Sequence, residues 1–204
     1  MATIGLSKLV LADYSAVGNT VTYKNGVNQE KLASYSAEFN TGETNYLYLD
    51  NQVAETDNSS FAGGTLTLAT GDLTPETTNL LYKLKTKSVM VNSQSYNTYI
   101  FDDECTSLEK GVGLIEKHQN NGKPFYRAIW FNRVKFDVKA DSATTQGKSV
   151  EWKTTEIKGQ ILRSEHIAEE DGNHPWKEFG DFPSEEIAFE FLKEKAKFPS
   201  PEAA

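Results

Sequence analysis

Histidine and acidic side chains that could together bind a metal ion or act in catalysis occur close to one another near the C-terminus. The stretch HIAEEDGNHP holds His166 and His174, with Glu169, Glu170 and Asp171 between them. Two histidines with carboxylates could hold a zinc ion, but this spacing matches no compact ligand motif, such as two histidines one helical turn apart. A solvated acidic turn is the better interpretation.

The single cysteine lies in a second acidic stretch, DDECTSLEK. Asp102, Asp103 and Glu104 precede Cys105 directly. Neighbouring carboxylates raise the pKa of a thiol and disfavour the reactive thiolate, so we expect an inert cysteine. No glycine-containing calcium loop follows the three acids, so they are interpreted as a solvated charge run.

The remaining catalytic signatures are missing from the sequence. It contains no glycine loop that would cradle a phosphate and no strained nucleophile turn. We therefore assign no catalytic, cofactor-binding or metal-binding residue and expect no cofactor. An enzyme that uses the carboxylates and His174 is the least supported of the functional hypotheses.

Aromatic side chains could instead form a binding platform. Tyr46, Tyr48 and Trp176 could present rings to a carbohydrate or a protein ligand. In a β-rich protein, however, aromatic residues more often belong to the core or to an interface. A monomeric β-sandwich binding module is the alternative hypothesis for this chain.

Length and charge limit the class of protein. The chain has 204 residues, 21 of them basic and 29 acidic, for a formal net charge of −8. This length suits about one domain with an appendage. Tight binding to a nucleic acid backbone needs lysine and arginine, so we do not expect it. No apolar run approaches the roughly 20 residues of a membrane helix, so we expect no membrane partner. We also expect synthesis in a reducing cytoplasm.

The elements that must position any site are mostly strands. In IWFNRVKFDV, residues 129–138, polar and apolar residues alternate, which predicts a strand with one dry and one wet face. Trp130, Asn132, Val134, Phe136 and Val138 share the predicted dry face. Trp130, Val134 and Phe136 are therefore expected to form the core strand.

Other strands are predicted from similar alternation and from turn signals. Asn25-Gly26 predicts a hairpin turn after the second strand, and Asn120-Asn121-Gly122 predicts another. The predicted strands are 6–14, 20–24, 31–40, 64–70, 112–118, 125–138, 149–153 and 156–162, with weaker candidates at 88–91 and 97–101.

Two segments predict helices. Thr74 is a good N-cap before Pro75, and Leu80, Leu81 and Leu84 give residues 75–84 an apolar side. Near the C-terminus, Ser184 caps a segment with acids in its first turn and lysines in its last. The apolar face of this second helix comprises Ile187, Ala188, Phe191 and Leu192.

Residues 41–63 predict neither a clean strand nor a helix. A loop of this length in a compact domain is usually functional or disordered, and its apolar residues argue against disorder. We therefore expect a functional segment. It includes Tyr46, Leu47, Tyr48, Leu49, Asp50 and Phe61.

Three stretches, taken in order, resemble one protein family. They are SAEFNTGETNYLYLDNQVAETDNSSFAGGTLTLATGDLTPE, KPFYRAIWFNRVKFDVKADSATTQGKSVEWKTTEIKGQILR and GNHPWKEF. Together they resemble the major tail proteins, or tail-tube proteins, of bacteriophages with long, flexible, non-contractile tails. The resemblance extends from about residue 4 to residue 179.

The resemblance implies a fold and an organisation along the chain. It implies a mainly β (α+β) protein in which two sheets pack as a sandwich or split barrel of the tail-tube type. Residues 1–180 would form this domain, with 41–63 as a long assembly loop and 75–84 as the flanking helix. Residues 181–204 would form a C-terminal helical extension.

The resemblance also implies a structural role in the virion. Six copies would close into a ring, and stacked rings would form the tube through which genomic DNA is delivered. The expected partners are further copies of the chain, tape-measure and tail-terminator proteins, and DNA that passes without sticking. The expected location is the virion tail, after assembly in the host cytoplasm.

Overall fold

The structure of the chain is a computed structural model. It describes residues 2–29, 31–42, 45–57, 60–71, 73–138, 154–167 and 172–199. The strands are β1 (Ala2–Val17), β2 (Thr20–Gln29), β3 (Leu32–Thr41), β4 (Asn45–Leu49), β5 (Gln52–Asp57), β6 (Phe61–Thr70), β7 (Lys85–Val91), β8 (Gln94–Ile100), β9 (Glu109–Asn120), β10 (Lys123–Phe136), β11 (Thr155–Leu162) and β12 (Lys177–Phe182). The helices are α1 (Pro75–Tyr82) and α2 (Glu185–Ala196).

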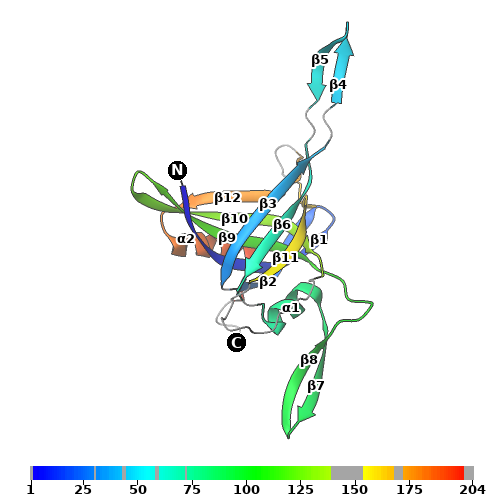
Figure 1. Ribbon diagram of the computed structural model, residues 1–204, viewed down its shortest axis with the longest axis vertical. Coiled ribbons are helices and arrows are strands. Elements are labelled where there is room, and N and C mark those ends of the chain that lie inside the picture. The colour runs from blue at the N-terminus through cyan, green and yellow to red at the C-terminus, as the bar shows by residue number, and fades with distance from the viewer. Residues whose placement is uncertain are drawn as a thin grey trace, which may run out of the picture.

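In the part of the chain that the structure describes, the body is one antiparallel sheet of eight strands. Its order is β2-β1-β9-β10-β11-β6-β3, and β12 pairs with the first half of β10 (Figure 1). The mainly β class is confirmed. Where two packed sheets were expected, the described strands of the body form this single sheet, which curls so that β1 and β9 face β6 and β11 across the main core.

Two apolar clusters hold the body together. The larger one lies inside the curled sheet and includes Leu11 from β1, Leu66 from β6, Phe131 from β10 and Leu81 from α1. The smaller one lies on the outer face of β1, β9 and β10, where α2 covers it. Because strands β1, β9 and β10 are covered on both faces, the alternation of buried and exposed residues breaks down there.

The prediction that Trp130 shares one dry face with Val134 and Phe136 is wrong, although all three side chains are fully buried. Trp130 lies in the smaller cluster under α2, whereas Val134 and Phe136 lie in the larger one. A β-bulge in β10 causes the change, because three steps from Phe131 to Val134 face only two steps on β9. The extra residue turns the following side chains to the other face.

Two glycines of β9 make room for the Trp130 ring. A Cβ atom at Gly111 would lie 2.3 Å from Cζ2 of Trp130, and one at Gly113 would lie 3.0 Å from Cε3 of the same ring. The indole therefore packs directly on the backbone of the neighbouring strand. The edge of the Tyr23 ring meets it with centroids 5.1 Å apart.

The predicted turn at Asn25-Gly26 is also wrong. Gly18 and Asn19 make the turn between β1 and β2, and Asn25-Gly26 lies within β2. Asn25 has a φ of 53°, and the pairing with β1 shifts by one residue at this point, so the dipeptide forms a bulge. Asn121 and Gly122 do form the predicted turn, between β9 and β10.

Both helices begin where the sequence predicts. The Thr74 side chain accepts a hydrogen bond from the backbone N–H of Thr77, and Pro75 follows the cap. The Ser184 side chain accepts one from Ile187. Helix α1 extends the larger core, where Tyr82 is fully buried and donates its hydroxyl proton to the carbonyl oxygen of Asp137, 2.8 Å away.

Helix α2 is part of the body. Its residues Ala188, Leu192 and Ala196 are buried against β1, β9 and β10, whereas Ile187 is exposed and Phe191 is half-buried. The boundary expected between residues 180 and 181 falls within β12. The strand predicted at 149–153 lies outside the described residues.

Candidate assembly surface

Five of the six residues proposed for assembly lie on one projecting hairpin. Tyr46, Leu47, Tyr48 and Leu49 belong to β4, and Asp50 begins the turn to β5. Figure 1 shows this hairpin beyond the ends of β3 and β6, away from the body. We call the hairpin of residues 45–57 the first arm. The structure gives it two strands where the sequence predicted none.

The first arm carries an apolar row on one of its faces. Tyr46 and Tyr48 lie two residues apart on β4, which places them on the same face. Their rings have centroids 6.2 Å apart, and Val53 of β5 pairs directly with Tyr48. All three side chains are exposed, and Tyr48 keeps 62% of its surface accessible. The side chains of Leu47 and Leu49 lie outside the description.

Phe61 lies at the base of the first arm and takes part in an aromatic stack. Its ring is parallel to that of Trp176, with 4.2 Å between centroids and 6° between planes. Phe39, on the other strand that leads to the arm, lies 4.8 Å from the same indole. The Trp176 ring therefore contacts both strands from which the arm extends.

Backbone hydrogen bonds fix the segment that carries Trp176. The backbone N–H of Ser164 donates to the carbonyl oxygen of Pro175 at 3.1 Å, and Nδ1 of His174 lies 2.8 Å from the carbonyl oxygen of Ser164. The backbone N–H of Asn132, in the bulge of β10, donates to the carbonyl oxygen of Trp176. The sequence left the role of His174-Pro175-Trp176 open, and these contacts show that the segment docks on the body.

Strands β7 and β8 form a second projecting hairpin. Figure 1 shows it leaving the body at the opposite end from the first arm. We call residues 85–100 the second arm. Every residue of its strands except Tyr99 is exposed, and Met90 keeps 67% of its surface accessible. The sequence contained the signal, because two alternating runs flank Asn92-Ser93, and both of these residues have positive φ.

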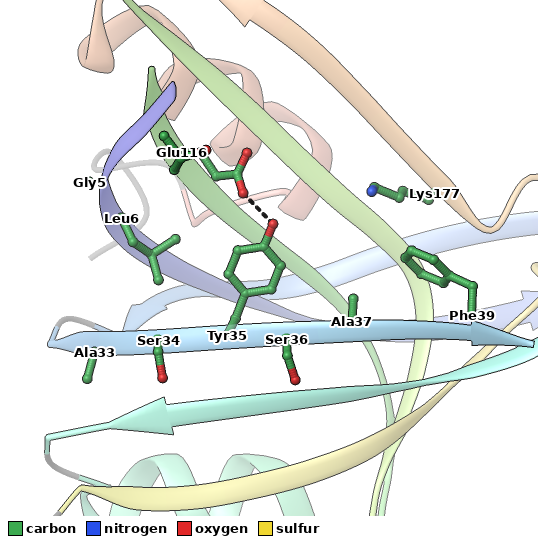
Figure 2. A pocket seen from close by; sticks show the side chains of 11 residues that line it. Gly5, Leu6, Ala33, Ser34, Tyr35, Ser36, Ala37, Phe39, Glu116 and Lys177 are labelled. Carbon is green, nitrogen blue, oxygen red and sulfur yellow. Dashed lines mark hydrogen bonds between the residues drawn. The ribbon is translucent and has the colours of Figure 1, made fainter. Parts of the chain in front are cut away.

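A groove lies between β3 on one side and β1 and β9 on the other. It has a volume of about 560 Å³. Figure 2 shows Tyr35 pointing from β3 to Glu116, and its hydroxyl donates to Oε1 of that carboxylate at 2.5 Å. The other oxygen, Oε2, lies 2.8 Å from Nε2 of His118. Both carboxylate oxygens thus have protein partners, and the contact joins β3 to the facing strand.

Burial controls the ionisation of two groups at this groove. It raises the pKa of Tyr35, and the carboxylate of Glu116, which accepts the tyrosine proton, raises it further. Burial lowers the pKa of Lys177, whose Nζ atom lies 5.2 Å from the centre of the Phe39 ring. Tyr35 is therefore a neutral donor at pH 7 and serves as a link between strands.

No protein-family model matches this chain, and no curated protein matches it. Within the part of the chain that the structure describes, no helix is long and apolar enough to span a membrane.

The residues considered for chemistry are dispersed in the structure. Cys105 is half-buried, and its Sγ atom lies 3.4 Å from the carbonyl oxygen of Tyr82. Asp102 and Glu104 both contact Lys85, at 2.6 and 3.5 Å. The candidate ligands Glu169, Glu170 and Asp171 lie outside the described residues. Among the residues that are described, no group of three or more histidine, cysteine or acidic side chains could hold a metal ion.

Proposed function

We propose that this chain is the structural subunit of a phage tail tube. In this proposal six copies form a ring, and the rings stack into the conduit of a long, flexible, non-contractile tail. Tape-measure and tail-terminator proteins would be its partners in the virion. The proposal combines the ordered sequence resemblance with the shape of the molecule.

The observation that carries the proposal is the pair of arms at opposite ends of the body. Each arm is a two-stranded hairpin with exposed apolar side chains, among them Tyr48 on the first arm and Met90 on the second. An isolated two-stranded hairpin is marginally stable in water, and exposed apolar surface commonly marks a protein contact. Arms of this kind are expected in a subunit that is completed by its neighbours.

The edges of the main sheet support the same function. Among the described strands of the main sheet, β2, β3 and β12 each pair with one neighbour only. Unpaired edges invite association with other chains, and closure into a ring would use them in one defined geometry. A ring of such subunits would join curled sheets side by side.

The charge balance suits a conduit for DNA. Each copy has a formal net charge of −8. Strong adhesion to DNA requires lysine and arginine contacts to phosphates, so an acidic tube would let the DNA slide. The placement of acidic residues on the inner wall is part of the proposal.

Assembly of the purified chain tests this function. We expect rings or tubes by negative-stain electron microscopy, and a particle mass that grows with concentration in light scattering. A protein that remains monomeric at high concentration would contradict the proposal. A glycan array and a protein pull-down then test the alternative, a monomeric binding module that uses Tyr46, Tyr48 and Trp176.

One observation bears on that alternative. The Trp176 indole stacks on Phe61 and contacts Phe39, so the structure uses this ring within the chain. Tyr46 and Tyr48 keep exposed rings that could contact a ligand. The binding module therefore depends on these two tyrosines, and Tyr48→Ala would weaken ligand binding in that case.

A further inference from the structure

The second arm has an apolar row that resembles the row on the first arm. Val89 pairs directly with Tyr96 across the two strands, and Val91 lies two residues further along the same face. All three are exposed. On the first arm, Tyr48 pairs with Val53 in the same way. Each arm therefore presents a cross-strand pair of a tyrosine and a valine, which is a favourable contact surface in sheets.

The two arms carry opposite charge. Residues 45–57 contain Asp50, Glu55 and Asp57 and no lysine or arginine. Residues 85–100 contain Lys85 and Lys87 and no acidic residue. Lys85 contacts Asp102 and Glu104 at the base of the second arm, whereas Lys87 lies further along the arm and is also exposed.

The positions of the arms determine which rows can meet. Figure 1 places the arms at opposite ends of the longest axis, so the two rows of one chain lie far apart. A contact between the same arm of two copies would place like charges together. A head-to-tail contact brings the acidic first arm of one copy to the basic second arm of the next.

We infer that the first arm of one subunit binds the second arm of a second copy, through the row of Tyr46, Tyr48 and Val53 and the row of Val89, Val91 and Tyr96. This inference rests on the proposed function and names the contact that would propagate the tube. In a row of subunits joined by head-to-tail contacts between unlike surfaces, one arm stays unoccupied at each end of the row. Growth by addition of further copies follows directly.

Cross-linking between two single-cysteine variants tests the inference. In a Cys105→Ser background, Gln52→Cys labels the first arm and Gln94→Cys labels the second, and both positions are exposed. A flexible bismaleimide should join the mixed variants at least about tenfold more efficiently than it joins either variant to itself, as expected for a specific contact. The control mixes Gln52→Cys with Lys158→Cys, an exposed position on β11.

A charge reversal provides a second measurement. Lys87→Glu, introduced together with Gln94→Cys, should lower the yield of mixed cross-link severalfold, because it places an acid against the acidic first arm. Lys158→Glu in the same protein should leave the yield unchanged. Equal yields for mixed and self pairs, or cross-links between like arms only, would overturn the inference.

The results also separate this inference from the proposed function. Tubes that form without the mixed cross-link would overturn the contact between unlike arms while the tail-tube function stands. A strong mixed cross-link in a protein that forms no ring or tube would support the contact and count against the tail tube. The cross-link is measured on subunits in solution and does not require a complete tube.

Discussion

Two half-buried tyrosines show how single residues join distant strands. Tyr35 links β3 to β9 through Glu116, and Tyr23 donates its hydroxyl proton to the carbonyl oxygen of Asn132 in the bulge of β10. Burial is the largest cause of the raised pKa of each phenol. Each residue therefore stabilises the fold in its neutral form, so the stability of the protein should depend on pH in alkaline solution.

We expect stability to fall as the pH rises above about 10, the ordinary pKa of tyrosine. Below that pH both phenols are neutral in the folded and unfolded states, so their contribution is fully present. Above it, Tyr23 and Tyr35 ionise only in the unfolded chain, which favours unfolding by up to about 1.4 kcal/mol per pH unit and residue. Urea unfolding at several pH values between about 9 and 11 measures the slope.

Phenylalanine variants test whether Tyr23 and Tyr35 cause this dependence of stability on pH. Tyr23→Phe with Tyr35→Phe should flatten this slope, although loss of the hydrogen bonds lowers stability at neutral pH. Tyr96→Phe, on the exposed second arm, should keep the wild-type slope. An unchanged slope in the double variant would contradict the assignment.

At the scale of elements, helix α2 belongs to the body because it packs over the smaller apolar cluster. Ala188, Leu192 and Ala196 cover the smaller cluster, and a Cβ atom at Gly113 would lie 2.9 Å from Cδ2 of Leu192. The helix thus rests directly on the backbone of β9. Its removal would expose the Trp130 ring.

Leu192→Ala should lower the free energy of unfolding by about 2–5 kcal/mol, as for other buried leucines. Ile187→Ala lies on the same helix and provides the control. Its side chain is 50% exposed, so its effect should stay within about 0.5 kcal/mol. Chemical denaturation measures both. Similar small effects would show that α2 is an appended helix and not part of the core.

The stack at the base of the first arm gives a second prediction at this scale. Trp176→Ala should destabilise the body by about 2 kcal/mol, because the ring is only half-buried, and should reduce tube formation more strongly than stability. Trp176→Phe keeps an aromatic surface between Phe39 and Phe61 and should assemble well. Negative-stain microscopy with urea unfolding separates the two effects. Normal tubes from the alanine variant would rule out support of the arm by this ring.

The sequence predicted most of the strands and both helices, but the predicted face of Trp130 and the predicted turn at Asn25-Gly26 were wrong. Both helix caps and the turn at Asn121-Gly122 follow local rules, and local rules are readable from a single sequence. The bulge after Phe131 was missed, although the consecutive polar residues Asn132 and Arg133 interrupt the alternation there, because the alternation resumes with Val134 and looks continuous over the whole strand. Asn25-Gly26 has the residues of a turn, but pairing of β2 with β1 on either side makes it a bulge.

Only part of the candidate assembly surface was predicted from the sequence. Residues 46–50 were singled out because apolar side chains in a long connection are unusual. The strands of the second arm were only weak candidates, at 88–91 and 97–101, and their projection from the body was not predicted, because exposure is a property of the whole fold. Phe61 was grouped with the arm by sequence proximity, whereas the structure places it on Trp176.

At the scale of the whole molecule, the body and the arms have separate sources of stability. The body has two buried clusters and a nearly continuous antiparallel ladder, whereas the arms bury little within the chain. Stability of the subunit should therefore depend on the body, and association should depend on the arms. A deletion can separate the two properties.

Replacement of residues 45–57 by a short glycine-serine turn should leave a folded, soluble protein that forms no tubes. Circular dichroism and urea unfolding should give values within about 1 kcal/mol of the full chain, because a surface hairpin adds little to the core. Electron microscopy should show particles without tubes. Normal polymerisation of the shortened protein would show that the first arm is not needed for assembly.

The aromatic stack beneath the first arm also has a mechanical consequence. Parallel rings such as those of Phe61 and Trp176 can slide over one another at small energetic cost, whereas the ladder hydrogen bonds of β3 and β6 resist shear. Force applied at the tip of the hairpin would therefore be absorbed first as rotation about its base, with the curled sheet left undeformed. A filament joined through such pivots would bend easily while its bore kept a constant width.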